Sequence, residues 1–501
     1  MKIISINVLY IDKHVVYCVL TLGDFKSGKC KGITVLGEGH VPCHRDAIPR
    51  SEWCIFHYPE KPEEFAKTFD EELRKDIERQ IKEHPNYLDF AGFDFPNEIH
   101  FVEDFKRVDF RKAIFRKKAF FTRKYDELGL KFQGWANFSG VEFHSEVFFD
   151  FALFSHGVEF LHAKFQDFAY FSYVQFEKAS FMACEFQEGV TFSSSSFNGE
   201  AVFRWAKFHR HVIFAEAEFH SEANFKEVVF KDFCDFSSSV FHNDLSLRLV
   251  SLDDIIIFEH TQVNNRLWIN PRYMGNHQYN IIKFSNVIFG DKGKIIISGS
   301  MGDIVNDFIC GILFRNTELT HFEFIDEVWH QKYRRKVITD EILLRLKEEP
   351  EHEILDQPSS EQVIQSYRRL RENFEDSKRY SEAGDFFIGE MEIIRNYSPI
   401  FFTRFLYTVY YGLSSYGESI ALPLIWSALI IFIVAGFNVL FFVKPIPELF
   451  LTEYLASLVN TFQKFLPFSS VSTFMDLVTK LLGTLLFGLI FIGLRRKLER
   501  R

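Results

Sequence analysis

A phenylalanine recurs every five or six residues between Phe132 and Phe241. A helix buries side chains about every 3.6 residues and a strand every second residue, so a five-residue step fits neither. It fits a coil of short straight edges, each of which sends one side chain to a central axis. Fixed-period self-similarity is typical of a solenoid, in which each coil depends on its neighbours for stability. The steps of five and six alternate strictly along Phe138, Phe143, Phe149, Phe154, Phe160, Phe165, Phe171 and Phe176 and, after one irregular step, resume from Phe186 to Phe241.

Small residues accompany the phenylalanines. Alanine stands two residues before the next phenylalanine at Ala136, Ala163, Ala179, Ala201, Ala217 and Ala223. The pattern resembles the pentapeptide-repeat family in its Phe-centred form. That resemblance implies a right-handed quadrilateral β-helix with about four repeats per turn. We expect the extra residue of each six-residue step to lie at a corner. The alternative, a Phe-rich globular core, does not account for the fixed spacing.

Looser repeats on both sides extend the expected solenoid to residues 88–330. Upstream, the run from Leu88 to Phe121 is rich in phenylalanine, and downstream the run from Gly311 resembles a final coil closed by Trp329. Irregular terminal coils act as caps. Roughly eleven coils stacked about 4.8 Å apart would give a rod about 50 Å long.

Charge, cysteine content and motifs exclude several classes of protein. The net charge is −10, and from Lys131 to Asp244 acidic residues outnumber basic ones two to one, so no nucleic acid is expected as a partner. Seven scattered cysteines favour a reducing compartment over a disulfide framework. The N-terminus alternates polar and apolar residues and does not read as a signal peptide. No nucleophile–base motif or phosphate loop is present, and the histidines of the repeat region fall between phenylalanines, so we do not expect an enzyme.

The N-terminal module, residues 1–87, contains a metal-binding pattern. An H-x2-C pair and a C-x2-H pair are separated by ten residues, and the four residues are His40, Cys43, Cys54 and His57. Two ligand pairs on tight turns suit the tetrahedral coordination of one structural zinc ion per chain. Cys30 and His44 are alternative ligands, and the competing interpretation is one buried cysteine with three surface residues. The charged segment that follows, residues 62–85, predicts a helix that caps the first coil.

Helical patterning replaces the phenylalanine repeat in a linker, residues 331–398. Between Tyr367 and Arg395 apolar residues fall on helical faces, and Ser381, Glu382 and Gly384 mark the expected link between two antiparallel helices. The charged residues stand at i, i+3 and i+4 spacing, which predicts solvated ion pairs rather than a catalytic cluster. This segment resembles the linker of pentapeptide-repeat membrane proteins, in which a YRxLRxxFE element precedes AGDFxxxEME.

The last part of the chain, residues 399–501, is expected to enter a membrane. Residues 399–415 are rich in aromatic side chains and predict an interfacial helix lying on the bilayer. Residues 420–443 contain no charge and are long enough to cross about 30 Å of hydrocarbon. A second span is expected at 474–494, followed by the basic tail RRKLERR, which places both termini in the cytoplasm. We expect the cell membrane of a prokaryote.

Between the two spans, residues 447–466 predict a re-entrant amphipathic helix. The order of span, re-entrant helix and span resembles the pore-loop domain of two-span potassium-channel-like proteins. No T-V-G-Y-G filter is present, so selectivity for potassium by a ring of carbonyl groups is not expected. The candidate pore-lining residues are Thr461, Gln463, Ser469, Asp476 and Lys480. The alternative interpretation pairs Asp476 with Lys480 at the headgroups and lays the preceding helix flat on the membrane.

Three functions fit this layout. The first is a homo-oligomeric pore for ions with a cytoplasmic repeat domain, because two spans per chain enclose no water path without further subunits. The second is a membrane-anchored scaffold whose solenoid binds a partner and which conducts nothing. The third, an acidic mimic of nucleic acid, is disfavoured by the membrane segment and by the modest charge density.

Overall fold

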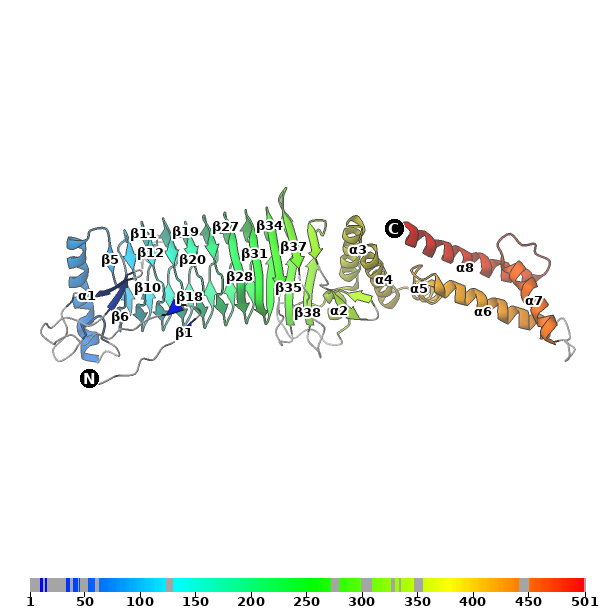
Figure 1. Ribbon diagram of the computed structural model, residues 1–501, viewed down its shortest axis with the longest axis horizontal. Coiled ribbons are helices and arrows are strands. Elements are labelled where there is room, and N and C mark those ends of the chain that lie inside the picture. The colour runs from blue at the N-terminus through cyan, green and yellow to red at the C-terminus, as the bar shows by residue number, and fades with distance from the viewer. Residues whose placement is uncertain are drawn as a thin grey trace.

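A computed structural model describes most of the chain from Glu63 onward and short pieces before it. The described residues are 10–11, 14–15, 33–36, 39–43, 45, 53–58, 63–122, 129–271, 279–298, 309–325, 329–332, 335–346, 355–440 and 450–499. Along its length the molecule is a long solenoid, a compact group of helices and, farthest from the N-terminus, a set of long helices (Figure 1).

The solenoid is built from parallel strands stacked on four faces, and about eight turns carry all four. One face is a ten-stranded sheet, close to the roughly eleven coils expected. Its strands are β7 (Ile99–His100), β10 (Ala119–Phe120), β14 (Val147–Phe148), β18 (Ala169–Tyr170), β22 (Val190–Thr191), β26 (Val212–Ile213), β29 (Cys234–Asp235), β32 (Ile255–Glu259), β35 (Tyr279–Ser285) and β38 (Ile309–Arg315).

A second face is an eight-stranded sheet. Its strands are β11 (Lys131–Phe132), β15 (Leu153–Phe154), β19 (Gln175–Phe176), β23 (Ser196–Phe197), β27 (Glu218–Phe219), β30 (Val240–Phe241), β33 (Gln262–Val263) and β36 (Ile288–Phe289).

The other two faces belong to one seventeen-stranded sheet, because the long strand β28 pairs with a strand of each face. Its strands are β5 (Leu88–Asp89), β6 (Asp94–Phe95), β8 (Val108–Asp109), β9 (Ile114–Phe115), β12 (Ala136–Asn137), β13 (Glu142–Phe143), β16 (Val158–Glu159), β17 (Lys164–Phe165), β20 (Ala179–Ser180), β21 (Glu185–Phe186), β24 (Ala201–Val202), β25 (Lys207–Phe208), β28 (Ala223–Phe230), β31 (Leu245–Leu252), β34 (Arg266–Pro271), β37 (Lys294–Ser298) and β39 (Phe322–Ile325).

The interior confirms the repeat derived from the sequence. Every phenylalanine of the regular series is at most 1% exposed, and each stacks on the equivalent ring one coil away, as Phe203 does on Phe181 and Phe225. The six accompanying alanines are also buried. A single side-chain type therefore fills the axis, and the stacking sets one coil in register above the next.

Two kinds of corner explain the alternating steps. In the five-residue steps two residues separate inward-facing positions, as between Phe149 and Ala152, whose backbones form a tight turn with an N–O distance of 3.0 Å. The third residue of that turn, Phe151, has a φ of 61°, the position at which a type II turn needs a positive φ. In the six-residue steps three residues separate Phe143 from Val147, so the extra residue lies at the corner, as expected.

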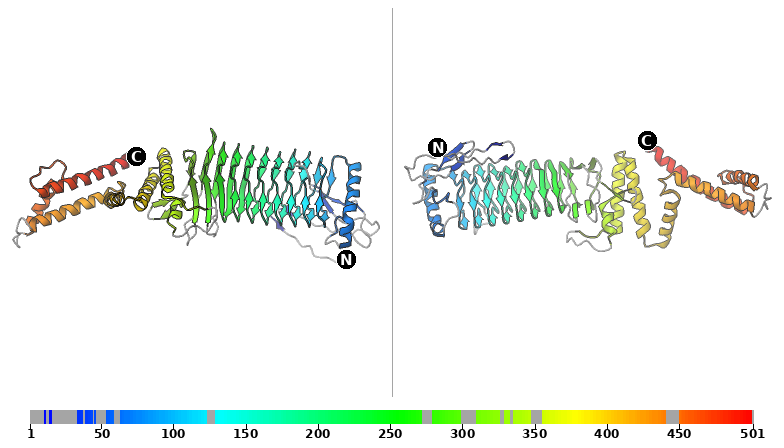
Figure 2. Two further views of the ribbon diagram at one scale, coloured as in Figure 1. Left: turned by 180° about the vertical axis from the view of Figure 1, so that it is seen from behind. Right: turned by 60° about the horizontal axis from the view of Figure 1, so that its bottom comes forward.

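Both ends of the solenoid are covered. Helix α1 (Glu63–Glu83) stands across the N-terminal end, as Figures 1 and 2 show. At the other end Trp329 is 8% exposed and its ring contacts Phe324, Phe374 and Phe386. The final coil is thus closed by Trp329 together with the linker helices.

The linker contains α2 (Thr339–Leu344), α3 (Ser360–Asp376) and α4 (Tyr380–Tyr397). A capping box at Ser359 and Gln362 starts α3. The expected link at residues 381–384 is wrong, since those residues form the first turn of α4 and the chain turns at residues 377–379. The hairpin β40 (His330–Lys332) and β41 (Arg335–Val337) precedes these helices. Among the described residues three short strand pairs lie outside the solenoid. Besides β40 with β41, they are β1 (Tyr10–Ile11) with β2 (His14–Val15), and β3 (Ile33–Leu36) with β4 (Gly39–Pro42).

In the described ranges 399–440 and 450–499, four helices follow the linker. They are α5 (Phe401–Ser414), α6 (Ala421–Asn438), α7 (Phe450–Phe465) and α8 (Phe474–Glu499). Helices α6 and α8 lie side by side, and α7 lies at the end of this pair farthest from the solenoid (Figures 1 and 2). The C-terminal end of α8 thereby returns to the linker.

Candidate metal site and membrane helices

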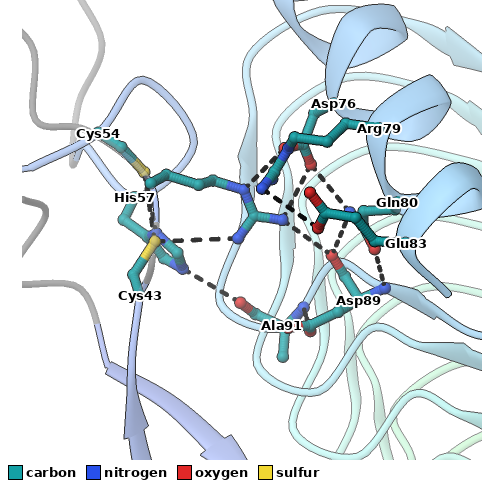
Figure 3. A network of polar contacts seen from close by, with 10 residues as sticks. Cys43, Cys54, His57, Asp76, Arg79, Gln80, Glu83, Asp89 and Ala91 are labelled. Carbon is teal, nitrogen blue, oxygen red and sulfur yellow. Dashed lines mark hydrogen bonds and ion pairs between the residues drawn. The ribbon is translucent and has the colours of Figure 1, made fainter.

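Three of the four predicted zinc ligands meet at the N-terminal end of the solenoid. The Sγ atoms of Cys43 and Cys54 lie 3.9 Å apart, and Cys54 Sγ lies 3.1 Å from His57 Nδ1 (Figure 3). A tight turn brings the last two together, because the His57 N–H donates to the Cys54 carbonyl oxygen at 3.2 Å. Cys43 follows strand β4 and reaches the same point from a separate segment.

These separations suit one tetrahedral zinc ion. Zinc lies about 2.3 Å from a thiolate and about 2.0 Å from an imidazole nitrogen, which places two sulfurs about 3.8 Å apart and a sulfur and a nitrogen about 3.5 Å apart. For His40 only the backbone, in strand β4, is described, and Cys30 and His44 lie outside the described residues. The fourth ligand therefore remains a prediction.

The His57 ring is already oriented for coordination. Its Nε2 lies 3.2 Å from the carbonyl oxygen of Ala91, in the first coil. If Nδ1 binds a metal, Nε2 must carry the proton and donate to that oxygen, the arrangement that fixes most metal-binding histidines. The metal site and the first coil therefore share a hydrogen bond.

Arg45 was missed by the sequence reasoning and connects the site to helix α1. Its guanidinium lies 3.8 Å from Cys43 Sγ through Nη1 and donates to both carboxylate oxygens of Asp76 at 3.0 and 2.9 Å. Its Cζ lies 4.6 Å above the ring of Phe93. Burial raises the pKa of Asp76, but the bonds from Arg45 outweigh it and hold that pKa below its usual value. The sequence could not have indicated the contact between Arg45 and Asp76, because no pattern distinguishes a single arginine two residues after a cysteine.

Helix α7 packs against both long helices. Tyr454 Oη donates to the Phe432 carbonyl oxygen at 3.2 Å and Ser457 Oγ to that of Ala435 at 3.1 Å, both in α6. At the other end of α7 the Phe465 backbone lies so close to Gly483 of α8 that a Cβ there would come within 1.9 Å of the Phe465 oxygen. This close approach of α7 to α8 requires glycine at position 483. The sequence alone did not reveal that requirement.

The five candidate pore-lining residues lie in α7, in the turn that follows it and at the start of α8. Thr461 is buried at 3% exposure, Gln463 is exposed and Ser469 is half-buried. The suggested pairing of Asp476 with Lys480 is wrong. Asp476 instead lies 3.5 Å from Lys464 and caps α8, while Lys480 donates to the Ser469 carbonyl oxygen at 2.7 Å. Lysine can reach that carbonyl because α7 folds back over the start of α8.

Two polar groups of α7 are buried without hydrogen-bond partners among the described residues. They are Thr461 Oγ1 and Glu453 Oε2. A buried polar atom without a partner costs roughly 1–3 kcal/mol, so such groups call for water, an ion or another chain. Sequence reasoning did not select Glu453, because one acidic residue in the first turn of a helix is ordinary.

Only some charged residues of the linker form the pairs expected from their spacing, as Arg371 does with Glu375 and Arg379 with Glu382, while others are buried. Glu390 is 2% exposed and accepts from Arg368 and Arg371 of the neighbouring helix at 2.9 and 2.7 Å. Arg335, also 2% exposed, bonds to Glu341 and Glu392 at 2.8 Å. Helical spacing predicted bonds within a helix, whereas Glu390 is bonded across the α3–α4 interface and Arg335 reaches α2 and α4 from strand β41.

Arg496, near the end of α8, joins the long C-terminal helices to the linker. Its Nη1 donates to the Tyr416 carbonyl oxygen at 2.9 Å and to Glu418 Oε1 at 3.1 Å. Its Cζ lies 4.5 Å above the ring of Phe387 in α4. The segment from Tyr416 to Ser419 and the end of α8 therefore meet on the last linker helix.

Comparison with known proteins agrees with the solenoid. The model of the family described as pentapeptide repeats (9 copies) matches residues 183–229, within the most regular coils. The solenoid is a pentapeptide-repeat domain. An uncharacterized protein of Methanocaldococcus jannaschii is 27% identical over 155 residues, which is 30% of this chain. The match spans 33% of that protein's own length, and no solved structure matches.

Beyond the pentapeptide-repeat domain, two helices are candidates to cross a membrane. They are α6, over Ala421–Asn438 with a mean hydropathy of 2.1, and α8, over Phe474–Arg496 with 2.2. Only 11% and 28% of these stretches are buried, whereas the core helix of a soluble protein would be mostly buried. Length, composition and exposure together make them membrane-span candidates.

Proposed function

We propose that this pentapeptide-repeat protein is an integral membrane protein whose helices α6, α7 and α8 assemble around an axis with further copies of the chain to form an ion pore. The spans would be α6 and α8, α7 would be the re-entrant helix, and α5 would lie on the bilayer surface. The solenoid and both termini would be cytoplasmic, in the cell membrane of a prokaryote. The protein would not be an enzyme.

The observation that carries this proposal is the pair of buried polar atoms in α7. Polar and ionisable groups within a membrane domain are costly unless they face water, protein or each other. Glu453 Oε2 and Thr461 Oγ1 have no such partner among the described residues. Water, or another copy of the chain packed against α7, would supply these two atoms with hydrogen-bond partners.

The exposed surface of α7 supports assembly. Leu451, Leu455, Val459 and Phe462 form one helical row, and they are 69%, 52%, 60% and 53% exposed. In a bilayer this row needs lipid or a neighbouring helix against it. Because two spans cannot enclose a water path, the pore would need copies related by a rotation axis.

Aromatic side chains support the surface position of α5. Phe401, Phe402 and Phe405 are 82%, 63% and 54% exposed and lie on one side of the helix. Exposed aromatic rings favour the headgroup region of a bilayer. The bilayer is therefore one expected partner of the chain.

The test is conductance by the full-length protein in planar bilayers. We expect stepwise currents, and Glu453→Gln should change cation preference while Glu78→Gln, on the exposed side of α1, should not. Gln463→Lys and Lys480→Glu should also change ion preference. Images of the detergent-solubilised protein should show a closed ring with an axial opening. If the planar bilayers carry no current at any voltage or pH tested, and the particle images show no axial opening, the membrane-anchored scaffold is favoured.

The N-terminal module would bind one structural zinc ion per chain through Cys43, Cys54 and His57, with His40 as the fourth ligand. The sulfur and nitrogen separations given above support this assignment. Elemental analysis of protein purified without chelator should find about one zinc per chain, and Cys54→Ser should lose it. Protein without zinc, or with Cys43 and Cys54 joined as a disulfide under reducing conditions, would contradict the assignment.

A further inference from the structure

The first coil of the solenoid presents an edge that needs a cover. Within the described part of the chain, strands β5, β6 and β7 have a coil on one side only, because the stack begins with them. Unpaired backbone groups at a sheet edge bind other edges, and terminal repeats need capping for solubility. Whatever covers this end therefore controls how firmly the first coil is held.

The turn that carries Cys54 and His57 forms part of this cover. The Asp94 N–H, in β6, donates to the Phe56 carbonyl oxygen at 2.9 Å, so the turn hydrogen-bonds as a further coil would. The Phe56 ring stacks on Phe93 with centroids 4.6 Å apart and an interplanar angle of 9°. The axial stack of rings thus continues into the segment that bears two of the metal ligands.

Helix α1 is the second part of the cover, and it is fixed through Arg45. Asp76 and Gln80 are both buried at 6% exposure on the side of α1 that faces the first coil (Figure 3). Gln80 exchanges two hydrogen bonds with the backbone of Asp89, at 2.6 and 3.0 Å. Arg45 bonds to Asp76 and, at 3.4 Å, to the Asp89 carbonyl oxygen.

A metal at these ligands would bridge segments that also touch one another, since Phe56 of the turn contacts Phe69 of α1 at 5.6 Å and Arg45 Cζ lies 5.4 Å from the centre of the Phe56 ring. Cys43 follows strand β4, Cys54 and His57 lie on the turn, and the first coil is contacted by His57. Arg45, two residues from Cys43, extends this connection to α1. A bound ion that holds Cys43 to Cys54 also fixes the position of Arg45.

We propose that the metal at Cys43, Cys54 and His57 locks the N-terminal cap of the solenoid, so that α1 and the first coil open when it is removed. This rests on the zinc assignment made above and adds what the zinc does. Loss of the metal frees Cys43 from the turn, and the Arg45–Asp76 bond loses its anchor at the same time. The edge of the first coil then becomes accessible to other strands.

The experiment is amide hydrogen exchange, followed by mass spectrometry, on the full-length protein in detergent under reducing conditions. Removal of zinc by a chelator should raise exchange at least tenfold in peptides from α1 and from residues 88–95. Peptides around Phe165, several coils away, should not change. Added zinc should restore protection from exchange. The chelated protein should also self-associate at a lower protein concentration than the zinc-loaded protein does.

One variant separates the cap from metal binding. Arg45→Ala should keep about one zinc per chain, because Arg45 is not a ligand, yet raise exchange in α1. Arg74→Ala, on the exposed side of the same helix, should change neither. Stoichiometric zinc whose removal leaves α1 and residues 88–95 protected would overturn the lock while the zinc assignment stands. Absence of zinc from the purified protein would contradict both the lock and the zinc assignment.

Discussion

Replacing Phe203 by alanine tests the physical basis of the solenoid. The ring is fully buried and stacks on Phe181 and Phe225, with centroids 5.0 and 4.6 Å away. It also meets Phe192 and Phe214 edge to face, at 5.5 and 5.3 Å. Phe→Ala changes in a core cost about 3–5 kcal/mol. Because each aromatic pair adds about 0.5–1.5 kcal/mol beyond burial, we expect a loss near the upper end, about 5 kcal/mol.

The loss should appear as faster local opening, because a solenoid is not a two-state unit. Hydrogen exchange of the full-length protein should accelerate by roughly three to four orders of magnitude in the coil of Phe203 and its neighbours, since about 1.4 kcal/mol corresponds to tenfold. Exchange several coils away should change much less, because each coil contacts only those beside it.

Two control variants fix the register. Phe151→Ala removes the same side chain from a corner, where it is 39% exposed, and Gln187→Ala changes an exposed residue between phenylalanines. Each should cost less than about 1 kcal/mol. The axial-packing argument fails if either control accelerates exchange as much as Phe203→Ala does.

Three further results are expected. Gly483→Ala should displace α7 by overlap with the Phe465 backbone, at a cost of about 1–3 kcal/mol, and reduce conductance, whereas Gly488→Ala has open space and should do neither; equal effects would contradict the packing of α7 on α8. Burial raises the pKa of Asp340 to about 6 against about 3.9 in an unfolded chain, so its contribution to stability is full below pH 4 and is lost as the pH rises through 6. The urea midpoint of the linker should fall by the equivalent of up to about 3 kcal/mol over that range, and Asp340→Asn should abolish this dependence; an unchanged pH profile in the variant would rule it out. Protease added outside intact cells should cut only residues 444–473, and cleavage of the solenoid from outside would reverse the proposed topology.

The repeat could be predicted in detail because its information is local. Each coil repeats the same short pattern, and the position of Phe203 or Ala201 within that pattern indicates that it faces the axis. The candidate spans could be predicted for a related reason, since length and apolar composition suffice to select α6 and α8. Ligand spacing likewise selected Cys43, Cys54 and His57, because two of them share one tight turn.

The tertiary structure alone determined which polar groups meet. Arg45 contacts Asp76 over a separation of 31 residues, and Arg335 contacts Glu392 over 57. No periodicity links such residues, because the contact depends on how α1 lies on the first coil and how α4 lies on strand β41. Some of the linker charges were misassigned to solvent for this reason, and Lys480 was paired with the wrong residue.

The amino-acid sequence by itself determined the solenoid, the helical linker and the two apolar helices, because those features follow from patterns that repeat within a few residues. The three-dimensional arrangement determined the contacts of Arg45 at the N-terminal cap, the buried atoms of α7 and the contact of Arg496 with the linker. These depend on long-range packing, in which a buried charge or a close backbone approach is fixed by surfaces far apart in the chain.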